Sequence, residues 1–129
     1  MTGGDGACAG LEFARALAAK DAERLLELLH PQIEFRALTP RRSWEADDRE
    51  AVLSVLLGHW FEEEDEIRAL ERLDGDGFAD RKGVRYRFRV VNPEGQFLVE
   101  QQAYLSEHDA QITWMRVVCS GYRPVAADE

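Results

Sequence analysis

Apolar residues follow a helical spacing in the first half of the chain. Between Leu11 and Ala19 they recur every three or four positions, which predicts a helix. A second helix is expected after Asp21, a residue type that caps helix N-termini, and it ends at His30-Pro31 because a residue before proline avoids the helical region. A third helix is expected after Asp47 or Asp48, with an apolar face formed by Val52, Val55, Leu56, His59 and Trp60.

Elsewhere apolar and polar residues alternate, which predicts strands. One such segment, Ile33–Ala37, lies between the second and third helices, and the proline-containing segment Thr39–Asp48 after it predicts a loop. The acidic run Glu62–Glu66 is assigned to solvated loop. Four further strands are then expected, at Ile67–Leu73, Val84–Val91, Gln96–Leu105 and Gln111–Cys119. Short turn-forming clusters at Asp74–Gly77, Asn92–Gly95 and Glu107–Ala110 separate these strands, which predicts an antiparallel meander.

This order of elements predicts one α+β domain. Three helices supply a single layer, so the expected architecture is a curved, mainly antiparallel sheet that wraps around them as a cone. A chain of 129 residues is long enough for one such core. The domain is placed at 9–123, with a Gly-rich disordered tail at 1–8 and a short C-terminal tail at 124–129.

The composition is acidic, with 25 Asp and Glu against 16 Lys and Arg and a net charge of −9. This charge repels phosphate, so neither nucleic acid nor an anionic membrane is an expected partner. The first residues lack the basic and apolar stretches of a leader, and no apolar run is long enough to span a bilayer, so a cytoplasmic location is expected. Cys8 and Cys119 are expected to be free thiols, and because His/Cys clusters and phosphate loops are lacking, no metal or cofactor is predicted.

The segment Ala16–Phe35, with the sequence ALAAKDAERLLELLHPQIEF, carries a family resemblance. It is similar to the first helix, acidic turn, second helix and first strand of the nuclear transport factor 2-like superfamily, which includes ketosteroid isomerases and SnoaL-like polyketide cyclases. Thr113–Val117 is similar to the last strand of that family. The resemblance covers about Leu11–Tyr122 and implies a cone with a pocket inside it, but it says little about chemistry.

The resemblance also indicates where a ketosteroid isomerase would carry its chemistry. Such enzymes use an aspartate base, a tyrosine and a protonated aspartic acid. The matching positions here hold Phe35, Phe13 and Gln101. Phenylalanine cannot accept a proton, and a neutral amide is a weak substitute for a carboxylic acid donor. Ketosteroid isomerase activity is therefore predicted to be absent. His59 is the remaining candidate acid or base, with a packing role as its alternative.

The concave face is expected to be largely apolar. Alternation points Phe35, Tyr86, Thr113 and Met115 inward. The predicted ligand-binding residues are Phe13, Phe35, Trp44, His59, Trp60, Tyr86, Gln101 and Met115. Three functions stay open: binding of an apolar or aromatic small molecule, a SnoaL-like cyclase, isomerase or hydratase using His59, and a non-catalytic dimeric assembly module with a filled cone. A cavity calculation separates the last function from the other two.

The opposite face of the sheet combines arginines, acids and aromatic residues. Trp114 and Val118 are out of place on a solvent-exposed face, and such a mixture is typical of an isologous interface. Pairing through this face is also what the resemblance implies. The expected homodimer interface comprises Arg85, Arg87, Arg89, Glu100, Gln102, Tyr104, Trp114, Arg116 and Val118, and Trp114→Glu is expected to weaken it.

Overall fold

The computed structural model describes residues 8–78 and 81–125, so most of both predicted tails lies outside the described residues. Its helices are α1 (Cys8–Ala18), α2 (Ala22–Leu28) and α3 (Arg49–Val55), the last continued by a π-helical turn, η1 (Leu56–Trp60). The strands are β1 (Leu29–Thr39), β2 (Arg42–Ala46), β3 (Glu66–Phe78), β4 (Arg81–Asn92), β5 (Gly95–His108), β6 (Gln111–Cys119) and β7 (Arg123–Pro124).

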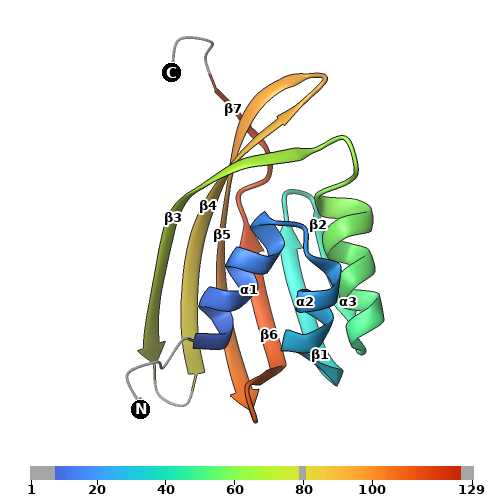
Figure 1. The fold of residues 1–129 in the computed structure, drawn as a ribbon, viewed down its shortest axis with the longest axis vertical. Coiled ribbons are helices and arrows are strands. Elements are labelled where there is room, and N and C mark those ends of the chain that lie inside the picture. The colour runs from blue at the N-terminus through green and yellow to red at the C-terminus, as the bar shows by residue number, and fades with distance from the viewer. Residues whose placement is uncertain (1–7, 79–80, 126–129) are drawn as a thin grey trace.

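The strands form one curved sheet in the order β2-β1-β6-β5-β4-β3, and the short β7 pairs with β5. The β1–β6 pair is parallel and the other pairs are antiparallel. The three helices lie across one face of the sheet, where α1 contacts β3, β4 and β6 and α3 contacts β1 and β2 (Figure 1). The predicted α+β class and the cone of sheet around helices are therefore confirmed.

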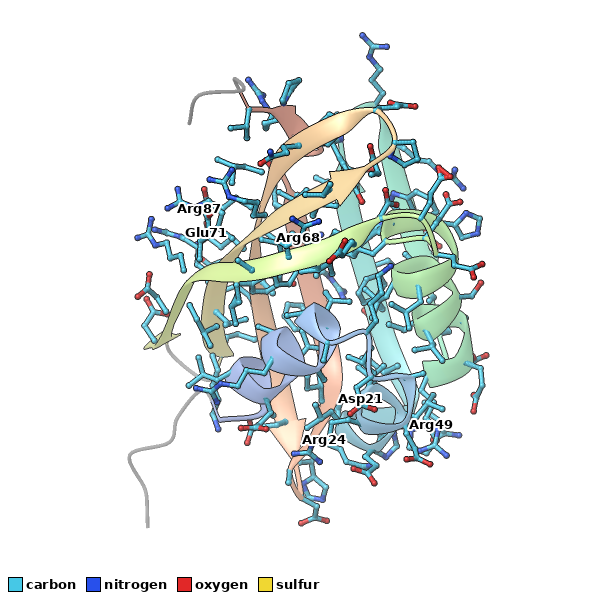
Figure 2. The ribbon with its side chains drawn as sticks, turned by 45° about the horizontal axis from the view of Figure 1, so that its top comes forward. Asp21, Arg24, Arg49, Arg68, Glu71 and Arg87 are labelled. Carbon is cyan, nitrogen blue, oxygen red and sulfur yellow. The ribbon has the colours of Figure 1, made fainter. Side chains whose placement is uncertain are left out.

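Side chains cap two of the helices as the sequence predicts. The Asp21 carboxylate accepts a hydrogen bond from the backbone N–H of Arg24 at 3.1 Å, at the start of α2 (Figure 2). The Asp48 carboxylate accepts one from the backbone N–H of Ala51 at 2.7 Å and so begins α3. Each cap satisfies an N–H group that has no partner inside its helix.

The segment predicted as a long loop, Thr39–Asp48, is instead mostly strand β2. The chain turns at Pro40-Arg41, where Arg41 takes a φ of 69°, and pairs back on β1 with Thr39 opposite Arg42. This strand lies at the sheet edge, and of its five residues only Ala46 is buried. An exposed edge strand needs no apolar alternation, which is why the pattern did not reveal it.

Two other polar segments also differ from their prediction. Asp74–Gly77 continues β3, with Asp74 opposite Arg85, and forms no turn; the connection to β4 lies at residues 79–80, outside the described part. In the acidic run, Asp65 is buried and not solvated, because its carboxylate accepts hydrogen bonds from the Glu62 N–H at 3.0 Å and from Asn92 at 2.9 Å.

The alternating rows predicted to point inward are mostly found in the core. Phe35 and Phe88 are fully buried between the sheet and the helices. In β6, however, an irregularity opposite Ser106 and Glu107 shifts the pairing, so that Ile112 and not Thr113 enters the core. The Thr113 hydroxyl donates to the backbone carbonyl of Ser106 at 3.3 Å.

Candidate functional site

The deep interior of the cone is filled by its own side chains. Phe13, Phe35, Tyr86 and Met115, four of the predicted ligand-binding residues, have no exposed surface. The Phe13 and Tyr86 rings lie 6.4 Å apart, and the Phe35 ring lies 6.0 Å from that of Trp60. The structure therefore places these four residues in the core.

A cavity of about 200 Å³ lies at the mouth of the cone, where the β1–β2 turn, η1 and the end of β6 meet. This volume exceeds that of an engineered cavity of about 150 Å³ that takes up benzene, so it has room for one substituted ring. Its lining contains the other four predicted residues, Trp44, His59, Trp60 and Gln101, together with Thr39, Phe61, Val99, Cys119, Gly121 and Tyr122.

Aromatic rings form one wall of this cavity. The Trp44 ring lies 6.1 Å from Trp60 in an edge-on arrangement and 5.3 Å from the exposed His59 ring. The indole N–H of Trp44 donates to the Thr39 hydroxyl at 2.8 Å, and the Arg42 guanidinium stacks on the ring at 3.6 Å. The hydrogen bond holds the edge of the Trp44 ring and the guanidinium covers one of its faces, so the ring is held in place without a ligand.

A row of three polar residues crosses the sheet beneath the cavity. Tyr86 of β4 is paired with Gln101 of β5, which is paired with Cys119 of β6. The buried Tyr86 hydroxyl donates to Gln101 Oε1 at 2.6 Å. Burial, and to a smaller degree the Cys119 thiol, raise the pKa of Tyr86 well above its usual value. The phenol is therefore neutral at physiological pH and serves as a hydrogen-bond donor.

The Cys119 thiol is also held in its neutral form. Burial raises the pKa of Cys119, and hydrogen bonding from the Gln101 side chain and the Gly121 N–H only partly offsets this. The Gly121 N–H donates to Sγ at 3.3 Å. Because the thiolate is the reactive species, this thiol is not an activated nucleophile.

The segment after β6 closes one side of the cavity. The Tyr122 hydroxyl donates to the backbone carbonyl of Trp60 at 2.8 Å, and its ring lies 6.1 Å from Phe61 and 5.5 Å from Phe97. Gly121 has a φ of 75°, and a Cβ there would come within 2.7 Å of the Pro40 ring. Only glycine allows this close approach.

Part of this lining could not be predicted from the sequence. Tyr122 follows the last predicted strand and belongs to no periodic pattern, so no sequence signal assigned it to the cavity lining. Cys119 was expected to point inward but was not assigned to the pocket. Thr39 is the last residue of β1 and belongs to the segment predicted as a loop.

Two other hollows lie elsewhere on the surface. One, of about 360 Å³, lies at the opposite end of the sheet, where Arg24 pairs with Glu12 at 3.6 Å and Glu27 at 3.1 Å. Its charged lining resembles ordinary solvated surface. The second, of about 290 Å³, is an apolar groove on the outer face of the sheet, lined mainly by residues of β1, β2 and β6.

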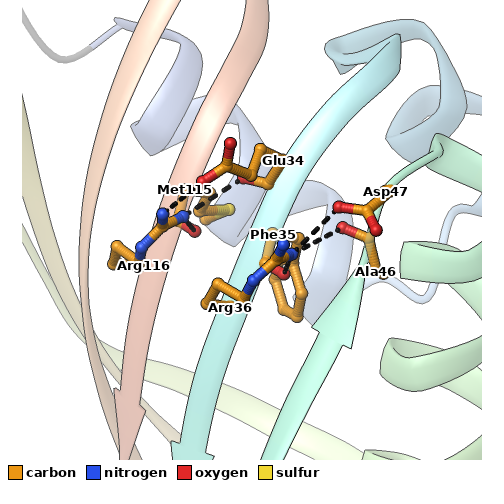
Figure 3. Close-up of polar contacts among 7 residues, drawn as sticks. All are labelled: Glu34, Phe35, Arg36, Ala46, Asp47, Met115 and Arg116. Atoms are coloured by element: carbon orange, nitrogen blue, oxygen red, sulfur yellow. Dashed lines mark hydrogen bonds and ion pairs between the residues drawn. The ribbon is translucent and has the colours of Figure 1, made fainter.

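Ion pairs cover much of that outer face. Arg116 pairs with Glu34 across the parallel strands, and Arg36 pairs with Asp47 at 3.0 Å (Figure 3). On the other half of the sheet, Glu71 lies between Arg87 and Arg89, at 3.6 and 2.6 Å; Figure 2 labels Glu71 and Arg87.

The Trp114 ring on the outer face is itself partly covered. Arg81 and Arg116 stack on Trp114 at 4.0 and 4.2 Å. The large apolar residues left exposed are Leu38 at 57%, Val118 at 59% and Tyr104 at 40%. Of the remaining residues of the predicted interface, Arg85, Glu100 and Gln102 are half-buried on the neighbouring strands β4 and β5.

The chemistry of the described residues is limited. No group of three or more potential metal ligands occurs within 8–78 and 81–125. None of the helices in this part of the chain combines the length and apolar character that crossing a bilayer requires. The cavity lining contains His59 and no Asp, Glu, Lys or Arg.

No family model matches the sequence, and no curated protein matches it either. Solved structures do match. A candidate isomerase from Bacillus subtilis superposes with a TM-score of 0.75 at 13% identity, covering 93% of this chain and 90% of that one. A candidate isomerase from Rhodopseudomonas palustris gives 0.71 at 16%, covering 88% and 90%, and a candidate polyketide cyclase from Xanthomonas campestris pv. campestris gives 0.67 at 16%, covering 88% of each chain. The chain therefore has the SnoaL-like, nuclear transport factor 2-like fold that the sequence resemblance predicted. At such low identity the likeness establishes the fold alone.

Proposed function

We propose that this domain binds a small, mainly apolar ring compound in the cavity at the mouth of its cone. The observation that carries the proposal is a cavity of about 200 Å³ walled by Trp44, Trp60 and Tyr122 and without a charged carboxylate or cation in its lining. Ligand sites in proteins are typically concave and lined by apolar and aromatic residues with a few polar groups. Because the interior behind the wall is filled, the ligand has the size of one substituted ring.

Filling the cavity tests this proposal. Cys119→Phe adds a ring to the cavity lining, whereas Cys119→Ala enlarges the same space. We expect wild type and Cys119→Ala to bind a one-ring probe such as acetophenone, and Cys119→Phe to lose at least about tenfold in affinity because the probe and the new ring overlap. Shifts of the Trp44 and Trp60 indole signals in NMR titrations report binding, and circular dichroism verifies folding. Equal affinities of a folded Cys119→Phe and wild type would refute the proposal.

An enzymatic role is the second candidate, favoured by the position of His59 on the cavity lining beside Trp44. A histidine there could move a proton to or from a bound ring compound, as an isomerase, cyclase or hydratase requires. Loss of turnover in His59→Gln with probe binding retained would favour this role. Ketosteroid isomerase activity is not expected, because Phe13 and Phe35 occupy the matching positions and are buried.

We also propose that two copies pair through the outer face of the sheet. The exposed Leu38, Tyr104 and Val118 surround the apolar groove, and the arginines and acids beside them can pair across a two-fold axis. Val118→Glu is expected to convert a dimer to a monomer at micromolar concentration, because it places a charge in the centre of the contact. Light scattering measures the mass, and Ser54→Glu on α3 is the control. A wild-type monomer would end this proposal.

We also propose a cytoplasmic location. The Cys119 thiol is free, as is usual for proteins of reducing compartments.

A further inference from the structure

Arg42 lies on the same side of the sheet as the cavity, at its mouth. Residues directly opposite each other in an antiparallel pair point to the same face. Trp44 is opposite Ala37, which is buried in the core, and Arg42 is opposite Thr39. Trp44 and Thr39 both line the cavity. Arg42 therefore ends the row of residues that forms this wall, where β1 turns into β2.

The Arg42 guanidinium covers the Trp44 ring, with its central carbon 3.6 Å from the ring centroid. The residue is exposed, so the charge stays in contact with water. A guanidinium that stacks on an aromatic face keeps its N–H groups in its own plane and can still donate two parallel hydrogen bonds to a carboxylate. Arg42 is thus both a part of the aromatic wall and an anion-binding group at its edge.

Arg42 also lacks a counter-ion within the described residues. Other arginines pair with acids, such as Arg36 with Asp47 at 3.0 Å and Arg72 with Asp74 at 2.7 Å. The Arg42 side chain forms no ion pair or hydrogen bond with residues 8–78 and 81–125, and its stacking on the ring is its one specific contact there. In a chain with a net charge of −9, this arginine is a local site of attraction for an anion.

The cavity itself sets the orientation of such a ligand. Its lining contains no Lys or Arg, and burying a carboxylate without a cation is expensive. The mouth differs, because a carboxylate there keeps part of its hydration and meets Arg42. The ring of the ligand therefore points inward and its charge points outward.

We infer that the ligand is a ring compound that carries a carboxylate on a short arm, with the ring in the cavity and the carboxylate on the Arg42 guanidinium. This inference rests on the proposed function and deepens it, since it names the chemical class that the site selects. Arg42 is then the residue that distinguishes an acid from a neutral compound of the same shape.

Matched acids and amides test the inference. Phenylacetate and phenylacetamide have the same ring and arm and differ in charge, and 3-phenylpropionate and its amide lengthen the arm by one carbon. The measured quantity is the ratio of the amide Kd to the acid Kd, obtained from NMR titrations that follow the Trp44 and Trp60 indole signals. In wild type, at least one of the two acids is expected to bind about 3- to 10-fold more tightly than its amide, the value of one partly exposed ion pair of good geometry.

Arg42→Gln is expected to lower this ratio to about one or below, because it removes the charge and the net charge of the protein then repels the acid. Any movement of Trp44 in this variant affects acid and amide alike, so the ratio reports the charge. Arg42→Lys keeps the charge but not the planar pair of donors, and it should retain only part of the wild-type ratio.

Arg24→Gln is the matched control. It removes the same charge from the hollow at the opposite end of the sheet, where Arg24 pairs with Glu12 and Glu27. The ratio should stay at its wild-type value in this variant. Circular dichroism verifies the folding of each variant.

Several results would overturn the inference. A ratio near one for both pairs in wild type would mean that the site does not select acids. An equal loss in Arg24→Gln would assign the preference to the overall charge, and a loss in His59→Gln but not in Arg42→Gln would assign it to the imidazole. In these cases the proposed function survives if Cys119→Phe still blocks acetophenone. If neither acetophenone nor any of the four probes binds wild type, the inference and the proposed function fail together.

Discussion

Phe35→Ala is expected to lower the free energy of unfolding by about 3–5 kcal/mol, a large part of the roughly 5–15 kcal/mol that holds a domain of this kind folded. Phe35 has no exposed surface and lies on β1, where it is paired with Ala46 on one side and Met115 on the other. Its ring also lies 6.0 Å from Trp60. Removing the ring leaves a void between the sheet and the helices, and because both layers are closely packed the surrounding residues can fill little of it.

Urea denaturation measures this effect as a lower midpoint at an unchanged slope. Gln32→Ala, at an exposed position of the same strand, serves as the control and is expected to stay within about 0.5 kcal/mol of wild type. A loss of less than about 1.5 kcal/mol in Phe35→Ala would show that the site can collapse, and would contradict the packing described above.

Raising the pH is expected to destabilise the fold steeply, because three acidic groups of the cavity region have raised pKa values. Burial is the first cause for Tyr86, Cys119 and Tyr122, and for Tyr122 the nearby Asp65 carboxylate adds to it. In the unfolded chain a thiol loses its proton near pH 8.5 and a phenol near pH 10. The unfolded state thus releases protons that the folded state retains, so this stability is complete below those values and is lost above them.

Each group that titrates only when unfolded contributes a slope of about 1.4 kcal/mol per pH unit. Stability should begin to fall above about pH 8.5 and fall faster above about pH 10. Tyr86→Phe is expected to remove one such contribution from the slope above pH 10, even though it also leaves Gln101 without its donor. Tyr122→Phe should have a smaller effect on the slope, since Tyr122 is only half-buried and solvent screens its charge.

Denaturant unfolding between pH 7 and pH 11 provides the measurement. Tyr104→Phe is the control, because it removes a phenol from the outer face of the sheet, away from the cavity. If Tyr86→Phe leaves the slope above pH 10 equal to that of wild type, the phenol ionises in the folded state and the polar row beneath the cavity is not sealed from water.

The fold could be predicted from residues whose burial imposes a regular spacing along the chain, and from residues that cap helices locally. Phe35 and Phe88 must enter one shared core, so their strands alternate, and Asp21 and Asp48 cap helices through a local bond that depends on little else. β2 escaped detection because an edge strand with one buried residue is under no such constraint.

The candidate site was only partly predictable, for a physical reason. Trp60 and Gln101 could be assigned to the concave face by periodicity, but which groups surround their side chains depends on the placement of every neighbouring atom. The hydroxyl of Tyr86 decides the orientation of Gln101, and Tyr122 reaches Trp60 through a turn that requires Gly121. Such contacts join residues distant in sequence and leave no periodic trace.

The parallel pairing of β1 with β6 also determines when the fold can form. Arg116 and Glu34 meet across this pair although 82 positions separate them, and the pair joins the β1–β2 hairpin to the rest of the sheet. Forming this contact closes a long loop of chain, an entropic cost that helices and hairpins do not bear. On a ribosome, the helices and the β3–β4–β5 meander can form early, whereas the cavity has to wait for residues 111–122 to emerge. Until then the edge of β1 that pairs with β6 has no partner strand, and this interval is when the nascent chain is most exposed to aggregation and to chaperones.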